Sequence, residues 1–145
     1  PALTGVTLPW HESEYALPFT ELEAALTQME RVIRALAFPA HLPMEVRFVK
    51  GDELWLSPTG GRDCAVIAVR VPQSGEYKDY FTAMAEIADR HDGRPSWGGM
   101  HGKTAAELRA LYPRFDDFLA LRQQLDRRGV FLNPHLSALF GIEQR

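Results

Sequence analysis

The sequence predicts an α+β fold: an antiparallel sheet carries two helices on one face, in the split βαβ, ferredoxin-like pattern, and further helices follow at the C-terminus. Two observations support this prediction. Segments with the periodicity of strands and helices follow one another as strand, helix, strands, helix, strand over residues 13–97. One of these segments, residues 64–71, contains almost no polar side chain, which is typical of a central strand.

The first two elements are a short strand and an amphipathic helix. Residues 13–17 predict a strand that ends at Pro18. Thr20 and Glu23 have the spacing of a capping box, so we expect Thr20 to be the N-cap of the helix. The helix should end before Pro39, since proline does not continue a helix. Its apolar residues recur every three or four positions and form one stripe: Leu22, Leu26, Met29, Val32, Ile33 and Leu36.

The middle of the chain predicts three strands. Residues 44–50 alternate, so that Glu45 and Arg47 leave one face of the strand and mainly apolar side chains leave the other. We expect the helices to cover the apolar side, which leaves the side of Glu45 and Arg47 bare. Residues 53–57 predict a second strand after a turn, and residues 64–71 predict the central strand.

The second half of the sheet layer is predicted as a helix and a last strand. A helical stripe runs over residues 77–88, and Gly93 is a suitable C′ residue to end the helix. We expect His91, beside the helix C-terminus, to be a surface residue. Residues 94–97 predict the last strand of the sheet.

The C-terminal third predicts short helices. Thr104 should open one of them, and Asp116 or Asp117 should open the next. The predicted domain organisation is a lead-in or linker over residues 1–12, followed by one domain over residues 13–145.

Composition excludes several classes of protein. The net charge of −3 and the pI near 6.0 offer no basic surface for nucleic acid. A single cysteine, Cys64, excludes an internal disulfide, and its apolar neighbours predict a buried packing residue. No histidine has metal-ligand spacing to another histidine or to cysteine, so we expect no metal site. With no membrane-span or signal-peptide pattern, we expect a cytoplasmic protein, with peripheral membrane association as the alternative.

Two local patterns are candidates for chemistry. Glu45 and Arg47 leave the same face of a strand, and a carboxylate beside a guanidinium can hold and orient hydroxyl groups. The simpler interpretation is an ion pair on a solvated face. The second pattern is Trp97 among glycines in residues 94–101, which suits close approach of a flat ring or a sugar. Its simpler interpretation is a glycine turn with a packed tryptophan.

The sequence carries no glycine-rich nucleotide motif and no nucleophile-elbow motif, so it offers no cofactor cradle of its own. Pro1 suggests a different class of enzyme, because an N-terminal proline can act as a base in tautomerases built from βαβ units. The residues that follow Pro1 lack the apolar first strand that such enzymes need.

Several motifs together resemble one family, and they follow one another at sensible spacing from about Glu14 to Gly141. They are Pro43-Met44-Glu45-Val46-Arg47-Phe48-Val49, Trp55-Leu56-Ser57, Arg94-Pro95-x-Trp97-Gly98, Tyr112-Pro113-Arg114-Phe115-Asp116-Asp117-Phe118 and Val130-Phe131-x-Asn133-Pro134. The chain resembles the C-terminal half of FAD-dependent sugar-1,4-lactone oxidases of the vanillyl-alcohol-oxidase type. That group includes D-arabinono-1,4-lactone and L-gulono-1,4-lactone oxidoreductases and alditol oxidases.

The resemblance implies a parent with an N-terminal FAD-binding domain and a C-terminal cap domain that closes over the flavin and contacts a sugar lactone or polyol. It implies catalytic roles for Arg47 and Glu45, with Arg47 stabilising negative charge and Glu45 orienting substrate hydroxyls. It also implies substrate contacts by Ser96, Trp97 and His101 and flavin contacts by Arg47, Trp97 and Gly98. We expect no tight FAD binding by this chain alone, and we expect the N-terminal half, or a second copy of the chain, to be its partner.

The sequence departs from the family motif His-Trp-Gly-Lys, because the matching positions are Ser96, Trp97, Gly98 and Gly99. The missing histidine and lysine imply either a different substrate or partner group, or weak catalysis. They also leave an alternative open: a non-catalytic binding or dimerising module of the same fold that has lost its flavin-binding half.

Overall fold

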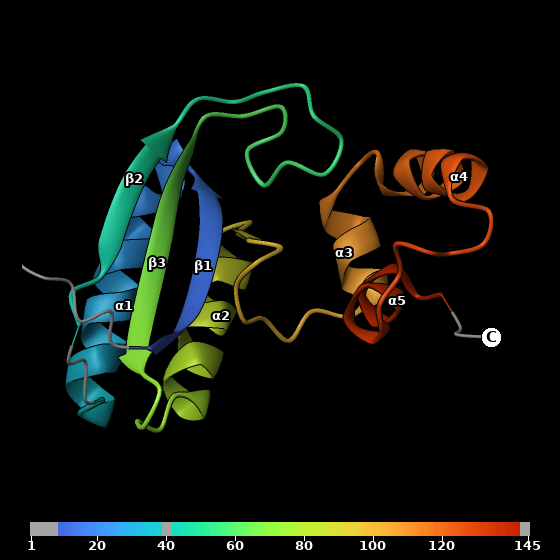
Figure 1. The fold of residues 1–145 in the computed structure, drawn as a ribbon. Helices are drawn as coiled ribbons and strands as arrows, with labels where there is room; N and C mark the ends of the chain where they lie inside the picture. Colours follow the sequence, from blue (N-terminus) through green and yellow to red (C-terminus); the bar gives the residue numbers. More distant parts are fainter. Residues whose placement is uncertain (1–8, 39–41, 143–145) are drawn as a thin grey trace, which may run out of the picture.

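The computed structural model describes residues 9–38 and 42–142. Its sheet has four antiparallel strands in the order β2-β3-β1-β4 (Figure 1). The strands are β1 (Trp10–Pro18), β2 (Glu45–Val49), β3 (Cys64–Pro72) and β4 (Arg94–Pro95). With helices between the strand pairs, this order is the split βαβ arrangement, and the predicted fold class is confirmed.

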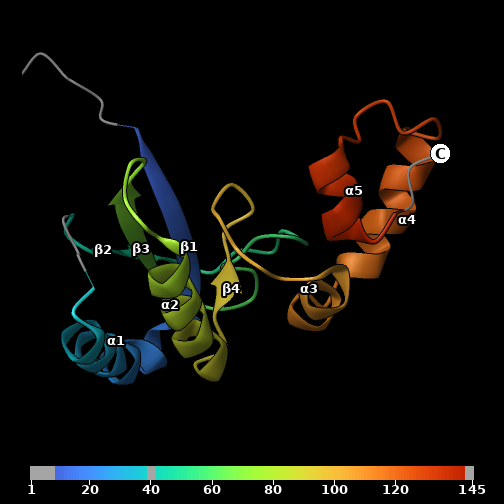
Figure 2. The same cartoon turned by 90° about the horizontal axis from the view of Figure 1, so that it is seen from below.

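Two long helices, α1 (Leu22–Leu36) and α2 (Lys78–Arg90), lie side by side on one face of the sheet (Figures 1 and 2). The main core lies between this face and the helices, because alternate strand residues and one stripe of each helix are apolar. Its fully buried members include Leu17, Ile67, Met29, Met84 and Ile87.

The start of α1 differs from the prediction. Phe19–Glu21 forms a 3₁₀ turn, and the helix proper begins at Leu22 with Glu21 at the N-cap. The predicted capping box of Thr20 and Glu23 is therefore wrong, because Thr20 lies inside the turn. Glu21, at the N-cap, makes no side-chain cap hydrogen bond.

Residues 53–57 do not form the predicted strand. The carboxylate of Asp52 accepts hydrogen bonds from the backbone N–H of Leu54 and the hydroxyls of Ser57 and Thr59, at 2.6–3.1 Å. These bonds hold the segment in a compact turn, and a single bridge joins Asp52 to Gly60. Aspartate favours such local bonding to the following backbone, which competes with an extended strand.

The end of α2 corrects two predictions. His91 is the C-cap and is buried, not on the surface: its Nδ1 lies 2.8 Å from Oε2 of Glu21 and its Nε2 lies 2.8 Å from Nε2 of Gln28. The left-handed residue that ends the helix is Asp92, with φ of 54°, rather than Gly93. Gly93 follows it and donates its N–H to the carbonyl of Ala88, where a side chain would collide at 2.8 Å.

Three short helices, α3 (Ala105–Leu111), α4 (Phe115–Leu125) and α5 (Pro134–Phe140), form a second cluster beside the sheet layer (Figure 2). Thr104 opens α3 as predicted, with a complete capping box shared with Glu107. α4 begins at Phe115, just before the predicted start. The buried core of this cluster consists of Leu108, Tyr112, Phe115, Leu139 and Phe140.

The first and last strands along the chain, β1 and β4, also differ from their predicted limits. β1 begins at Trp10, so residues 10–12 belong to the sheet rather than to a lead-in. β4 covers only Arg94 and Pro95. Cys64 is buried in β3, as predicted, whereas Pro1 lies outside the described residues. Within the described ranges, no helix is long and apolar enough to cross a membrane.

Candidate active face of the sheet

The face of the sheet opposite α1 and α2 carries a group of charged residues, which we call the charged face: Glu12, Glu14, Glu45, Arg47 and Arg70. Strand residues alternate between faces. Since Tyr15 and Leu17 pack into the main core, Glu12 and Glu14 must lie on the other side of β1. The register places Glu12 opposite Arg70, and Glu14 and Glu45 on either side of Ala68.

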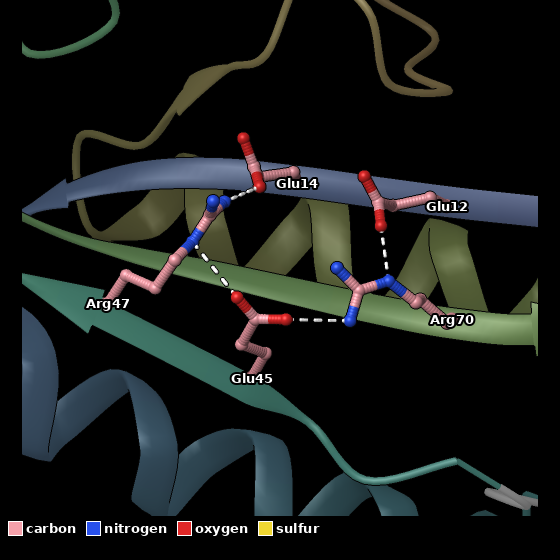
Figure 3. A network of polar contacts seen from close by, with 5 residues as sticks. All are labelled: Glu12, Glu14, Glu45, Arg47 and Arg70. Atoms are coloured by element: carbon pink, nitrogen blue, oxygen red, sulfur yellow. Dashed lines mark hydrogen bonds and ion pairs between the residues drawn. The ribbon is translucent and has the colours of Figure 1, made fainter. Parts of the chain in front are cut away.

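The five side chains form one chain of alternating charges across three strands (Figure 3). Arg47 contacts Glu14 through Nη2, and its Nε lies 3.2 Å from Oε1 of Glu45. The other oxygen of Glu45 lies 2.8 Å from Nη1 of Arg70, and Arg70 contacts Glu12 through Nε. Both oxygens of Glu45 therefore face a guanidinium, and each arginine lies between two carboxylates.

The small side chains of β3 make this network possible. Ala68 and Val66 lie on the same face beneath it and are buried, at 0% and 8% exposure. Neighbouring strands lie about 4.8 Å apart, so residues on β2 and β1 are about two such spacings apart. Long side chains from β1 and β2 can meet only where the strand between them carries short ones. Arg47 and Glu14 meet in this way, over β3.

The electrostatics of the charged face favour the ionised forms of Glu45 and Arg70. The hydrogen bond from Arg70, and then the positive charges of Arg70 and Arg47, hold the pKa of Glu45 below its ordinary value. The pKa of Arg70 is raised, first of all by its hydrogen bond to Glu45. Three carboxylates and two guanidinium groups leave one net negative charge. The carboxylates of such a face can accept hydrogen bonds from several hydroxyl groups while its guanidinium groups donate hydrogen bonds to others.

The predicted pair of Glu45 and Arg47 is thus brought together, whereas Trp97 lies elsewhere. The indole of Trp97 donates from Nε1 to the carbonyl of Leu56 at 2.7 Å. Its ring packs against Tyr112 and Phe140, with centroids 5.2 and 6.1 Å away. Trp97 therefore joins the loop between β2 and β3 to the cluster of α3–α5.

The neighbours of Trp97 lie along the edge of β1, next to one end of the charged face. The backbone N–H of Ser96 donates to the carbonyl of Glu14 at 2.9 Å. A Cβ added at Gly99 would lie 3.4 Å from the backbone nitrogen of Glu14, an ordinary contact, and one added at Gly98 would meet nothing within 4 Å. The position of the missing family lysine is therefore beside Glu14 and is sterically able to hold a side chain.

His101 lies in a different place from Glu45 and Arg47. It lines a cavity of about 440 Å³ together with Tyr15, Phe81 and Lys103. Because Tyr15 faces the helices, this cavity is on the helix side of β1. Nδ1 of His101 accepts the backbone N–H of Lys103 at 3.3 Å, Nε2 is buried without a protein partner among the described residues, and burial lowers the pKa of the imidazole.

Glu12, Glu14 and Arg70 were not predicted from the sequence. Two signals pointed to them. Arg70 is the one charged residue in the apolar run of the central strand, and Glu12 and Glu14 alternate with the buried Ser13 and Tyr15. Within the described part of the chain, no group of three His, Cys, Asp or Glu side chains could hold a metal ion.

Comparison with known proteins gives the family. The family model for D-arabinono-1,4-lactone oxidase matches residues 3–139. The chain is 42% identical over 130 residues to L-gulono-1,4-lactone dehydrogenase of Mycobacterium tuberculosis, a match covering 90% of this chain and 30% of that protein. It is 34% identical over 139 residues to L-gulonolactone oxidase of Scyliorhinus torazame (90% and 31%), and 36% identical over 154 residues to alditol oxidase of a Streptomyces species (93% and 37%). The chain thus spans about a third of the length of these relatives, and it belongs to the D-arabinono-1,4-lactone oxidase family.

Proposed function

We propose that this chain is the substrate-side, C-terminal part of an FAD-dependent oxidoreductase that oxidises the CH–OH group of a sugar 1,4-lactone or a polyol. The names of the relatives support this substrate class, since they are lactone oxidases or dehydrogenases and an alditol oxidase. The FAD would be held mainly by another part of a longer polypeptide. The relatives support this as well, because the match covers only about a third of their length.

The observation that carries the proposal is the placement of Glu45 and Arg47 on the charged face. Both side chains are partly exposed, at 40% and 49%, although each is held by ion pairs. They are therefore fixed in position and still accessible to a ligand. A preorganised charge acts on a reacting centre without further reorganisation, which is the requirement for electrostatic catalysis.

The residues of this chain fit one end of the cofactor only. The sequence has no glycine-rich cradle for a pyrophosphate, whereas the charged face can meet the polar edge of a flavin ring and a hydroxyl-rich substrate. When bound, the flavin supplies the acceptor of the hydride. Arg47 would stabilise negative charge that develops at the ring edge or at the substrate oxygen.

Glu45 would orient the substrate by accepting hydrogen bonds from its hydroxyl groups. It would do so as a carboxylate, because its two arginine neighbours keep its pKa low. It is therefore better suited to accepting hydrogen bonds than to holding a transferred proton. Ser96, whose N–H donates to the carbonyl of Glu14, and Gly98, two residues further along the chain, would contact substrate and flavin from the side.

Trp97 and His101 would act less directly. The ring of Trp97 is already packed and hydrogen-bonded, so its contribution would be to hold the glycine-containing segment in place. The ring of His101 lines the cavity on the helix side, so it would not touch the substrate directly. It would affect the substrate only by positioning the segment that runs from Ser96 to His101.

The test is Arg47→Ala in the full-length flavoprotein that contains this chain. The rate constant for flavin reduction by a lactone or polyol, measured by stopped-flow absorbance, should fall by about a hundredfold or more. Glu45→Ala should raise KM more than it lowers turnover. Arg34→Ala is the matched control, since Arg34 is an exposed, ion-paired arginine on α1, and it should change neither value. If flavin reduction is unchanged in Arg47→Ala, the active face has been placed on the wrong side of the sheet.

The non-catalytic alternative is tested on the isolated chain and on a restored motif. Calorimetric titration of the chain with FAD should show no submicromolar binding, because nothing in the sequence can hold the pyrophosphate. Gly99→Lys in the full-length protein should increase turnover on lactones or polyols, since the position can hold a side chain beside Glu14. A module that has lost catalysis altogether would gain nothing from this lysine.

A further inference from the structure

The ion pairs of the charged face come from three strands, and this determines which residues can move. Arg47 lies on β2, an edge strand, and half of its side chain is exposed. A long side chain in that position has many rotamers unless something holds it. The position of its guanidinium therefore depends on the groups that it contacts on β1 and β2.

Glu14 is the better anchored of the two carboxylates that hold Arg47. It lies in β1, which is paired with β3 on one side and β4 on the other. Its carbonyl accepts the N–H of Ser96, and its side chain is only 17% exposed, against 40% for Glu45. Glu14 thus presents a nearly fixed carboxylate, and the guanidinium of Arg47 reaches across β3 to it.

Arg70 has the corresponding relation to Glu45. It lies in the central strand β3, its side chain is 22% exposed, and Glu12 holds its Nε. Its Nη1 contacts the oxygen of Glu45 that Arg47 does not use. The orientation of the Glu45 carboxylate is therefore set from the interior of the sheet.

We propose that Glu14 and Arg70 are positioning residues of the active face: Glu14 fixes the guanidinium of Arg47, and Arg70 fixes the carboxylate of Glu45. This proposal rests on the proposed function of Arg47 and Glu45. Neither Glu14 nor Arg70 needs to touch the substrate or the flavin. A displacement of about 1 Å in a catalytic group can cost up to about a hundredfold in rate, so the loss of either anchor should be measurable.

The first test is Glu14→Gln, which keeps the shape of the side chain and removes its charge. In the full-length flavoprotein, flavin reduction should slow by about tenfold to a hundredfold, with little change in KM. The decisive measurement is a double-mutant cycle with Arg47→Ala. If Glu14 acts through Arg47, Glu14→Gln has no further effect once Arg47 is absent. A purely structural role for Glu14 would slow both backgrounds equally.

The second test uses pH. Arg70→Met removes the hydrogen bond that is the main cause of the low pKa of Glu45, so that pKa should rise. The acid limb of the kcat/KM profile should then move to higher pH, because Glu45 becomes protonated earlier as the pH falls. Arg70→Lys keeps a positive charge beside Glu45 and should leave the acid limb closer to that of the parent, provided that both variants fold as judged by circular dichroism.

The control is Glu30→Gln, which removes a carboxylate from an exposed ion pair with Arg34 on α1. It should leave rate and pH profile unchanged. If Arg47→Ala slows flavin reduction but Glu14→Gln and Arg70→Met do not, the positioning roles are overturned while the proposed function stands. If Arg47→Ala itself has no effect, the proposed function fails first, and the positioning roles fail with it.

Discussion

The two faces of the sheet are built from the same strands, and they differ in almost every physical property. On the helix side, Leu17, Ile67 and Val69 are buried beneath α1 and α2. On the charged face, Glu14, Ala68 and Arg70 alternate with them along the same backbone. The first face is held by apolar burial, whereas the second carries partly exposed, ion-paired charges. Substitutions one residue apart should therefore affect different measurements.

The largest effect on stability is expected on the helix side. Leu17 is fully buried, and Leu17→Ala leaves a cavity in the main core. The free energy of unfolding, from chemical denaturation, should fall by about 2–5 kcal/mol. Glu12→Gln, on the charged face of the same strand, is the matched control and should stay within about 1 kcal/mol of the parent. Equal losses would mean that the charged face is as important for folding as the core.

His91 is a polar exception on the helix side. Its imidazole joins Glu21 at the start of α1 to the end of α2 through two contacts of 2.8 Å, and Gln28 is the second partner. His91→Ala removes a buried group with both bonds, so thermal or chemical denaturation should show a loss of about 1–3 kcal/mol. His135→Ala, at an exposed histidine, should have no such effect. A stable His91→Ala protein would show that the two helices are held by apolar packing alone.

On the charged face, Arg47→Ala should change stability little. The ion pairs of Arg47 are partly solvated, and exposed pairs contribute about 0–1 kcal/mol each. The same substitution that we expect to slow flavin reduction by about a hundredfold or more should therefore leave the denaturation curve nearly in place. A large loss of stability would mean that the network has a structural function, and the rate effect would then need the double-mutant cycle for its interpretation.

The smallest expected effect is a pH dependence. Folding lowers the pKa of Glu45 from the ordinary 4.5, chiefly through the hydrogen bond from Arg70. The resulting stabilisation is fully present above the ordinary pKa and is lost as the pH falls through the folded-state value. An NMR titration of the Glu45 carboxyl should show this lowered pKa, and Arg70→Met should raise it. An unchanged pKa in Arg70→Met would contradict the contact.

Local patterns in the sequence were sufficient for the layer structure and for the central pair of the site. The alternation around Glu45 and Arg47 and the apolar run of residues 64–71 predicted strands that the structure confirms. The same patterns did not predict the local hydrogen bonds and turns that compete with regular strands and helices. Asp52 bonds the backbone and hydroxyls that follow it, so residues 53–57 form a turn, and a 3₁₀ turn places the start of α1 two residues after Thr20.

The remaining site residues depend on long-range pairing. Arg47 and Glu14 are 33 residues apart, and Arg70 and Glu12 are 58 apart. Their contacts follow from the register of three strands, which no local pattern specifies. The same limit explains Trp97 and His101. Neighbouring glycines suggested close approach of a flat ring or a sugar at Trp97. Its indole instead bonds Leu56 and packs on Tyr112, and the ring of His101 lines the cavity on the helix side of β1.

The single cysteine of the chain makes it possible to measure, by thiol labelling, how often the sheet opens. Cys64 is 1% exposed at the start of β3, where it pairs with Val49 on one side and Pro18 on the other. Burial also raises the pKa of its thiol, which keeps the reactive thiolate scarce. A thiol reagent can therefore modify the chain only when this end of the sheet separates. The labelling rate would report how often this end of the sheet opens, without any engineered probe and in the presence or absence of a partner on the charged face.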